Sequence, residues 1–345
     1  MSVPAPTKPA EDPLDALLRD PNGRLAARRG RVYAVQELRR LLRSGAGRRL
    51  ERERPEERER FQALAPRFPD VLRELLRRFP SPPAEPTWAG VYPGIAQRMV
   101  PDPPFRFLRI PPLSRGGAYW DAYDPIVAAE LKGVEEWLGK MAVGPADVLR
   151  ENAVGGPYLY DRRYPTSSML VQHAVHVCSL WKEVGIRPSD LHRVVEWGGG
   201  YGSMARILFR FQPRLSYVIL DTPVMLALQW LFLSTVLGPD RVVLPGSTDG
   251  SWAEGRVHLQ NSSSFGPVGE APDLFLSTYA LSESPKTLVE GVAARRFFGA
   301  EHLWVAYTPT HPDFPQWQVL EAAAVQSGAR VVRHPVRTKD RYACR

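Results

Sequence analysis

Val194-Val-Glu-Trp-Gly-Gly-Gly-Tyr-Gly202 is the stretch that decides the fold. Two β-branched residues lead into Glu196, which predicts a strand that ends at this acid, and Met204 to Phe211 predicts a helix after the glycines. Glycine has no Cβ and adopts positive φ easily, so such a turn lets the backbone approach a ligand closely. The helix N-terminus adds unpaired N–H groups and the positive end of its dipole. The stretch therefore predicts a nucleotide-type cofactor site.

The spacing of the glycines favours one cofactor over another. The dinucleotide fingerprint needs G-x-G-x-x-G, with alanine tolerated at the last place. Counted from the first glycine its last position falls on Ser203, and counted from Gly200 it falls on Ala205. An NAD-dependent oxidoreductase therefore stays an alternative. The motif Glu196-x-Gly-x-Gly-x-Gly202 instead uses the acid and three alternating glycines, as S-adenosylmethionine (SAM)-dependent methyltransferases do.

A second acid follows one βα unit later. The segment Ser216-Tyr-Val-Ile-Leu-Asp221 predicts a short apolar strand that ends in a carboxylate. A carboxylate in this position accepts hydrogen bonds from the two ribose hydroxyls, and each bond to a charged group contributes about 1.5–3 kcal/mol. Asp221 is therefore the predicted ribose ligand.

Length and composition limit the number of domains and the classes of protein that the chain can belong to. The 345 residues suffice for one α/β domain and an accessory region. We find no apolar run of about 18 residues and no signal-peptide pattern, so we expect a cytoplasmic protein without membrane contact. Cys178 and Cys344 lie far apart without metal-ligand spacing, which argues against a zinc site built from cysteines.

The net charge of +8 comes mainly from the N-terminal part, because residues 21–80 hold 17 Arg against 8 Asp or Glu. Binding to nucleic acid or to an anionic surface is one interpretation. Residues 48–60, however, mix both signs, as solvated helices do, and Arg outnumbers Lys throughout. We therefore expect no nucleic-acid partner.

The chain divides into a disordered tail (1–13), a mostly helical accessory region (14–150) and a methyltransferase-like domain (151–345). Residues 81–112 are rich in proline and predict a linker that packs on the rest through its aromatic side chains. Apolar stripes at helical spacing predict amphipathic helices, which are also a candidate homodimer surface. Their members are Leu14, Leu17 and Leu18; Val35, Leu38, Leu41 and Leu42; Val71, Leu72, Leu75 and Leu76; and Ile126, Leu131, Val134, Trp137 and Leu138 within a helix over 123–150.

From Val194 onward strands alternate with helices, which predicts a mostly parallel sheet with helices on both faces. The last two strands are too close together for a parallel crossover and predict an antiparallel hairpin. The result is a Rossmann-like seven-stranded sheet with one antiparallel strand. The predicted strands are 193–197, 216–221, 241–245, 273–278, 302–307, 329–335 and 341–345. The predicted helices are 167–185, with Gly185 as its C-cap, then 202–211, 223–237, 286–298 and 316–327. Residues 246–272, which include His258, read as an insertion that forms part of a substrate lid.

Three stretches resemble the bacterial sugar O-methyltransferase family, over roughly residues 160–345. They are Glu196-Trp-Gly-Gly-Gly-Tyr-Gly202, Leu220-Asp-Thr-Pro223 and Asp273-Leu-Phe-Leu-Ser-Thr-Tyr-Ala-Leu-Ser-Glu283. The third departs from the family pattern, with Ala280 where serine is usual and Ser284 where methionine is usual.

The resemblance implies SAM as the cofactor, a sugar hydroxyl as the acceptor and Glu283 as the general base. Its motifs supply the predicted cofactor-binding residues, which are Glu196, Gly198, Gly200, Tyr201, Gly202, Asp221, Thr222 and Ser277. By side-chain chemistry His311, in the loop after the fifth strand, is the better base, because histidine titrates near neutral pH. The choice between these two residues stays open.

Other candidates carry less weight. His173 and His176 lie three residues apart on a predicted helix, but no carboxylate completes a metal site, so we predict no metal. Tyr158, Tyr160 and Tyr164 either stack on a sugar or pack in the core.

The function predicted is a SAM-dependent O-methyltransferase that acts on the sugar hydroxyl of a nucleotide-sugar, polysaccharide or glycosylated natural product. The alternatives are a methyltransferase for a peptide or another natural product, and a non-catalytic SAM-binding scaffold.

Overall fold

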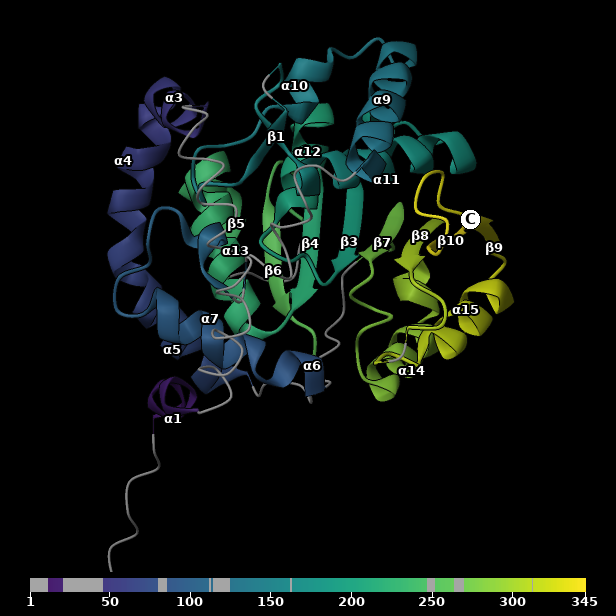
Figure 1. The fold of residues 1–345 in the computed structure, drawn as a ribbon. Helices are drawn as coiled ribbons and strands as arrows, with labels where there is room; N and C mark the ends of the chain where they lie inside the picture. The colour runs from purple at the N-terminus through teal and green to yellow at the C-terminus, as the bar shows by residue number, and fades with distance from the viewer. Residues whose placement is uncertain are drawn as a thin grey trace, which may run out of the picture.

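The computed structural model describes residues 12–20, 46–79, 86–111, 113, 125–161, 163–246, 252–263, 270–311 and 313–345. Within these ranges eight strands form the central sheet, in the order β5-β6-β4-β3-β7-β8-β10-β9 (Figure 1). The strands are β3 (Arg193–Trp197), β4 (Ser216–Asp221), β5 (Val242–Val243), β6 (Val257–Asn261), β7 (Leu274–Thr278), β8 (His302–Tyr307), β9 (Arg330–Arg333) and β10 (Arg341–Cys344).

The order of the strands places the glycine stretch at a special position. The chain builds the sheet outward from β3 through β4 to β6 on one side, then returns to β7 and β8 on the other. The point between β3 and β7 is therefore a topological switch point, where open α/β sheets bind ligands. All these strands run parallel, whereas β10 is antiparallel to both β8 and β9. This is the predicted Rossmann-like SAM-methyltransferase fold, with β6 as an eighth strand that the sequence did not predict.

One predicted strand is shorter than expected, and one strand was missed. The predicted strand 241–245 is only the two-residue edge strand β5, and the neighbour of β4 is β6, inside the segment predicted to be a lid insertion. The β6 sequence Val-His-Leu-Gln-Asn carries polar residues, although it pairs with strands on both sides. His258 is buried there, and its Nε2 accepts a hydrogen bond from the Ala253 N–H at 3.3 Å. A buried parallel strand usually shows a continuous apolar run, and its absence hid β6.

The two faces of the sheet follow the period of two in its strands. In β3, Val194 packs in one apolar cluster with α11, α12 and α13, whereas Val195 and Trp197 pack in another with α14 and α15. These helices are α11 (Ser168–Val184), α12 (Ser203–Phe211), α13 (Pro223–Leu237), α14 (Lys286–Ala294) and α15 (Trp317–Gln326). As predicted, α11 ends at Gly185, which adopts the left-handed conformation at φ +87°.

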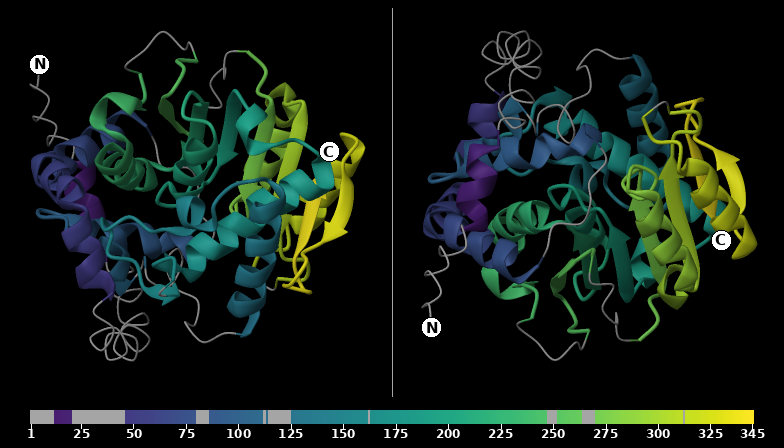
Figure 2. Two further views of the ribbon diagram at one scale, coloured as in Figure 1. Left: turned by 90° about the horizontal axis from the view of Figure 1, so that it is seen from above. Right: turned by 90° about the horizontal axis from the view of Figure 1, so that it is seen from below.

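The accessory helices pack on the same core as the sheet. Views from above and below show the N-terminal helices along one side, next to α13, and β9 and β10 at the opposite end (Figure 2). They are α1 (Pro13–Arg19), α3 (Ala46–Glu53), α4 (Pro55–Leu64), α5 (Phe68–Arg78), α6 (Pro86–Ala89), α7 (Val91–Met99), α9 (Pro125–Lys140) and α10 (Pro145–Leu149). A small hairpin, β1 (Leu159–Asp161) with β2 (Thr166–Ser167), follows them. Helix α13 is apolar on nearly all sides because it lies between the sheet and these helices.

The apolar stripes that fall on described residues pack against the core of this chain. Leu14, Leu72 and Leu75 are buried, and the stripe over residues 35–42 lies outside the described residues. The helix predicted over 123–150 is interrupted at 141–144, and Ile126 is exposed while its neighbour Val127 is buried instead.

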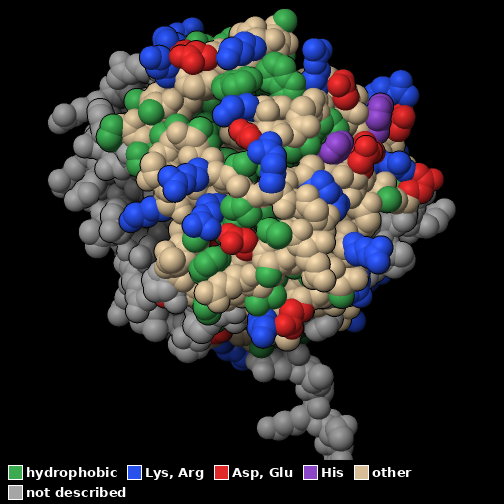
Figure 3. Space-filling model, turned by 90° about the vertical axis from the view of Figure 1, so that its right-hand side faces the viewer, with side chains coloured by type: hydrophobic (Ala, Val, Ile, Leu, Met, Phe, Trp, Pro, Cys, Tyr) green, Lys and Arg blue, Asp and Glu red, His purple; other side chains and the backbone are tan. Residues whose placement is uncertain are grey.

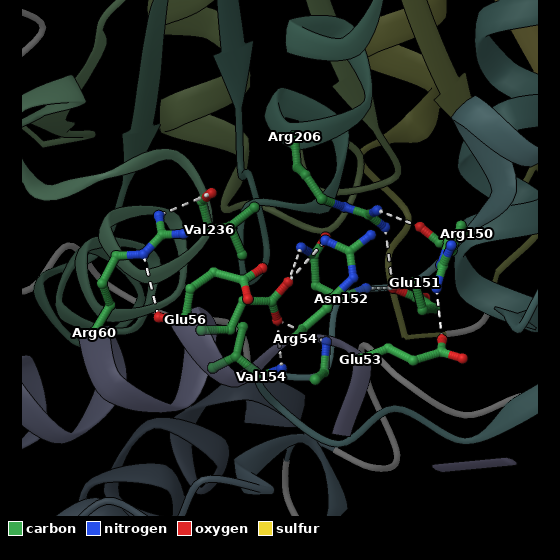
Figure 4. Close-up of polar contacts among 12 residues, drawn as sticks. Glu53, Arg54, Glu56, Arg60, Arg150, Glu151, Asn152, Val154, Arg206 and Val236 are labelled. Carbon is green, nitrogen blue, oxygen red and sulfur yellow. Dashed lines mark hydrogen bonds and ion pairs between the residues drawn. The ribbon is translucent and has the colours of Figure 1, made fainter. Parts of the chain in front are cut away.

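A polar network joins α4 to the helix that follows the glycine stretch (Figure 4). The buried carboxylate of Glu57 accepts hydrogen bonds from Asn152 Nδ2 at 2.7 Å and from the Val154 N–H at 3.0 Å. Arg206 of α12 forms a fully buried ion pair with Glu151, with 3.1 Å between Nη2 and Oε2. Removing one partner of such a pair costs about 3–5 kcal/mol, because the other charge stays buried. The accessory helices and the sheet are thus joined by buried polar contacts as well as by apolar packing.

Among the described residues, no helix combines the length and the apolarity needed to cross a bilayer. Cys178 and Cys344 are buried free thiols, and burial raises the pKa of both.

Candidate active site

A cavity of about 740 Å³ opens at the carboxyl ends of the parallel strands. The glycine stretch and Asp221 form one part of its lining. Glu283, from the loop after β7, and His311, from the loop after β8, line the same cavity. The structure therefore brings together predicted residues that lie more than 110 positions apart in the sequence.

The glycine loop is packed so closely that side chains do not fit. Gly198 has φ +76°, and a Cβ built there would lie 2.1 Å from the Cβ of Ala280. Gly202 has φ +99°, and its Cβ would lie 2.8 Å from Leu233 Cγ. Gly200 also has positive φ, but a Cβ there would meet nothing within 4 Å. Two glycines therefore allow close packing, and the third presents bare backbone where a ligand can approach.

Hydrogen bonds hold the Asp221 carboxylate at the end of β4, and the Gly199 N–H is one of the donors. Its Oδ1 accepts a hydrogen bond from the Thr222 N–H at 2.8 Å, and its Oδ2 accepts one from Gln229 Nε2 at 2.7 Å. Gln229 Nε2 also donates to the carbonyl oxygen of Gly200 at 3.0 Å, so one amide joins the strand end to the glycine loop. Burial raises the pKa of Asp221 to about 7 in spite of these donors. Each carboxylate oxygen has a further lone pair for a ligand hydroxyl.

Glu196 is the second acid on this side of the cavity. It is 1% exposed, and its Oε2 accepts a hydrogen bond from the Tyr217 hydroxyl at 2.9 Å. Burial and, to a smaller extent, the nearby Asp221 charge raise its pKa to about 8, although the hydrogen bond from Tyr217 lowers it. Two buried carboxyls next to one glycine loop favour a ligand that offers hydroxyl or ammonium donors.

The remaining predicted cofactor residues fall into two groups. Tyr201 and Thr222 line the cavity, and the Tyr201 ring packs edge-on against Phe232 with 4.9 Å between centroids. Ser277 is fully buried and is not among the lining residues. Its hydroxyl donates to the Trp197 carbonyl oxygen and accepts from the Leu281 N–H, both at 3.0 Å. Ser277 thus ties the end of β3 to the loop after β7.

Glu283 and His311 differ in the contacts that they make. Burial raises the pKa of Glu283 to about 7, while a hydrogen bond from Trp88 lowers it. His311 Nδ1 accepts a hydrogen bond from the Asp313 N–H at 3.2 Å, and its ring lies against Phe314. A neutral imidazole whose Nδ1 accepts carries its proton on Nε2, so His311 presents a donor at that nitrogen.

Sequence reasoning missed an aromatic wall of the cavity. Trp88 and Tyr92 line it and stack on each other, with 6.2 Å between ring centroids. Their helices α6 and α7 lie below the strand ends in Figure 1. They belong to the proline-rich segment, which was predicted to pack on the rest but not to reach the site.

Histidines from α11 also reach the cavity. His173 and His176 line it, and burial lowers the pKa of both, to about 3 for His173. His176 Nδ1 lies 3.0 Å from the Tyr342 hydroxyl. In the described part of the chain neither belongs to a group of three or more His, Cys, Asp or Glu placed to hold a metal.

Two of the tyrosines considered for sugar stacking lie elsewhere. Tyr158 is buried, and the Tyr164 hydroxyl donates to Glu135 at 2.7 Å. Neither lines the cavity, and the side chain of Tyr160 lies outside the described residues. The interpretation as packing residues was the better one for Tyr158 and Tyr164.

Comparison with known proteins adds only distant likenesses. No protein-family model matches the chain, and no curated protein matches it. A family 2 O-methyltransferase from Planctomyces limnophilus, solved with apigenin, is 12% identical, with a TM-score of 0.32, 44% of this chain covered and 49% of that one. The chain thus spans about half the length of that protein. Magnesium protoporphyrin IX methyltransferase from Synechocystis, solved with SAM, is 14% identical, with a TM-score of 0.34 and coverages of 50% and 79%. A mitomycin 7-O-methyltransferase is 12% identical, with a TM-score of 0.37 and coverages of 76% and 72%.

Proposed function

We propose that this chain is a SAM-dependent O-methyltransferase that transfers a methyl group to a sugar hydroxyl. The observation that carries the proposal is the shared cavity. Its lining includes a glycine loop at the switch point, an acid at the carboxyl end of each of two adjacent strands, and the Glu283 carboxyl group with a pKa of about 7. General bases work best when their pKa lies near the operating pH.

The residues present fit this cofactor. Asp221, anchored by Thr222 and Gln229, accepts hydrogen bonds from the two ribose hydroxyls. Glu196 and the backbone around Gly200 hold the methionine part, whose ammonium group suits a buried carboxylate.

When bound, SAM supplies an electrophilic methyl group on a sulfonium. The acceptor hydroxyl is a weak nucleophile, so a residue has to take its proton as the new bond forms, which typically contributes about 10²–10⁴-fold. Glu283 takes this role, because its half-buried side chain lines the cavity and its pKa lies near neutrality. His311 donates from Nε2 and orients the acceptor oxygen, since its Nδ1 is engaged by the Asp313 N–H.

A sugar is the proposed acceptor because the motif resemblance points to it and because the cavity lining, although largely apolar, also carries hydroxyl and charged groups. Away from the glycine loop the lining includes the Tyr279 hydroxyl, which donates to Asp340 Oδ2 at 2.9 Å, and Thr308, which donates to Asp340 Oδ1 at 2.8 Å. Such groups suit a ligand with several hydroxyls. A peptide or another natural product as the acceptor is the alternative.

The proposal is tested by calorimetric titration of the protein with SAM, S-adenosylhomocysteine (SAH) and NAD, in the wild type and in Asp221→Ala. Binding of SAM and SAH that is lost in the variant supports the proposal. Binding of NAD alone overturns it. If none of the three ligands binds, the result argues against a SAM-dependent enzyme.

A further inference from the structure

A second hollow of about 640 Å³ adjoins the cavity on the side of His311. We call it the basic hollow and define it by Arg333, Lys339 and Arg341 together with Thr308, His311 and Thr338. The two threonines, His311 and Lys339 also line the cavity, so the two spaces share a wall.

The basic character comes from the C-terminal hairpin. Residues 330–345 contain six Arg or Lys and only one acid, Asp340. In the pairing of β9 with β10, Arg333 lies directly opposite Arg341. Like charges directly opposite each other on adjacent strands destabilise a sheet. An anion bound between them would offset that repulsion.

Of the three cations that line the hollow, Arg341 has an acidic partner among the described residues. Glu321 binds Arg341 at 3.2 Å and also accepts a hydrogen bond from the Tyr307 hydroxyl. Asp340 is 9% exposed and accepts from Tyr279 and Thr308 on the cavity side. Asp313, close to His311, is exposed and does not line the hollow.

Two cations thus remain available. Arg333 and Lys339 are exposed, and among the described residues neither makes an ion pair. Figure 3 views the side of the molecule that carries β9 and α15, where Lys and Arg side chains are numerous at the surface.

We infer that the basic hollow binds a phosphate-type anion on the acceptor, so that the substrate is a phosphorylated or nucleotide-linked sugar. This inference rests on the proposed function. The anion would lie between Arg333 and Lys339, and the hydroxyl to be methylated would enter the cavity past His311 toward Glu283. Arginine and lysine bind phosphate oxygens through charge-assisted hydrogen bonds, and the threonine hydroxyls add neutral donors.

The test uses the full chain and separates anion binding from catalysis. Inorganic pyrophosphate and uridine diphosphate glucose are titrated calorimetrically into the wild type, Arg333→Gln and Lys339→Gln. The matched control is Arg330→Gln, which removes the same charge from the same strand. Arg330 binds Glu183 on α11 and does not line the hollow.

We expect each hollow variant to bind both ligands at least about tenfold more weakly, because a hydrogen bond to a charged group is lost. The Arg330→Gln control should bind them as the wild type does, and SAH binding should be unchanged in all variants. Methyl glucoside, which carries no anionic group, should bind the wild type and the hollow variants with the same affinity.

Three results would overturn the inference. They are no saturable binding of pyrophosphate, an equal loss in Arg330→Gln, or glucuronate binding as tightly as pyrophosphate. Absence of SAH binding would instead refute the proposed function, and the titrations with anions report on the hollow independently of it.

Discussion

Replacement of Asp221 by asparagine tests the proposed ribose contact without changing the shape of the side chain. Both carboxylate oxygens already accept a hydrogen bond, from the Thr222 N–H and from Gln229 Nε2. In Asp221→Asn an NH₂ group replaces one of these oxygens, so a donor faces a donor. Gln229 relieves that conflict only by rotating its amide, which removes its hydrogen bond to the Gly200 carbonyl oxygen. The variant thus loses the charge and disturbs the glycine loop.

The expected loss of affinity follows from the hydrogen bonds involved. Two ribose hydroxyls that donate to a charged acceptor contribute about 3–6 kcal/mol together, at about 1.5–3 kcal/mol each. The asparagine oxygen retains part of this. We therefore expect SAH to bind Asp221→Asn at least about 10²-fold more weakly, with about 1.4 kcal/mol for each factor of ten.

The pH dependence gives a second, independent readout. Burial raises the pKa of Asp221 to about 7, and the ribose hydroxyls bind its ionised form. In the wild type the affinity for SAH should therefore fall as pH drops below about 7, by up to about tenfold per pH unit. Asp221→Asn should lack this component.

The assay is calorimetric titration with SAH between about pH 5.5 and 8.5, and Glu290→Gln, on the exposed side of α14, is the control. Binding by Asp221→Asn within threefold of the wild type, or an unchanged pH dependence in the variant, would refute the reasoning.

Three further predictions concern the loop, the base and the stability. Gly198→Ala should unfold at a lower temperature than the wild type and bind SAH more weakly, because the new Cβ would overlap Ala280. The control is Gly139→Ala on α9, where a Cβ meets no neighbouring atom. In the same thermal scan it should be neutral or stabilising. In a radiolabelled methyl-transfer assay Glu283→Gln should lower kcat by about 10²–10⁴-fold, while its affinity for SAH stays unchanged. His311→Ala should lower kcat by a smaller factor. If His311→Ala lowers kcat more than Glu283→Gln does, His311 is the base. The cavity carboxyls at 196, 221 and 283 have folded-state pKa values raised to about 7–8, so the folded protein without ligand holds protons that the unfolded chain releases. Its stability against denaturant should fall as pH rises from about 5 to 8, and a rise over this range would contradict the raised pKa values.

The sequence predicted the residues whose role is local. The acid, the glycines and the following helix are contiguous, and their conformation follows from glycine φ values and from the strand before them. The final antiparallel hairpin was also predictable, because the connection between the last two strands is too short for a parallel crossover.

What the sequence did not reveal depends on tertiary contacts. Gln229 lies on a largely apolar helix, and only the fold shows that its amide joins Asp221 to Gly200. Trp88 and Tyr92 follow prolines in a segment without periodicity, so nothing local places them at the cavity. The charge of the region after residue 80 is near neutral as a whole, which hid the basic C-terminal hairpin.

The most direct test of the account is a crystal structure of the protein with SAH bound. We predict that the ribose hydroxyls lie within about 3.2 Å of the Asp221 carboxylate, with the sulfur directed toward Glu283. SAH bound away from the glycine loop, or with its ribose out of contact with Asp221, would contradict the account.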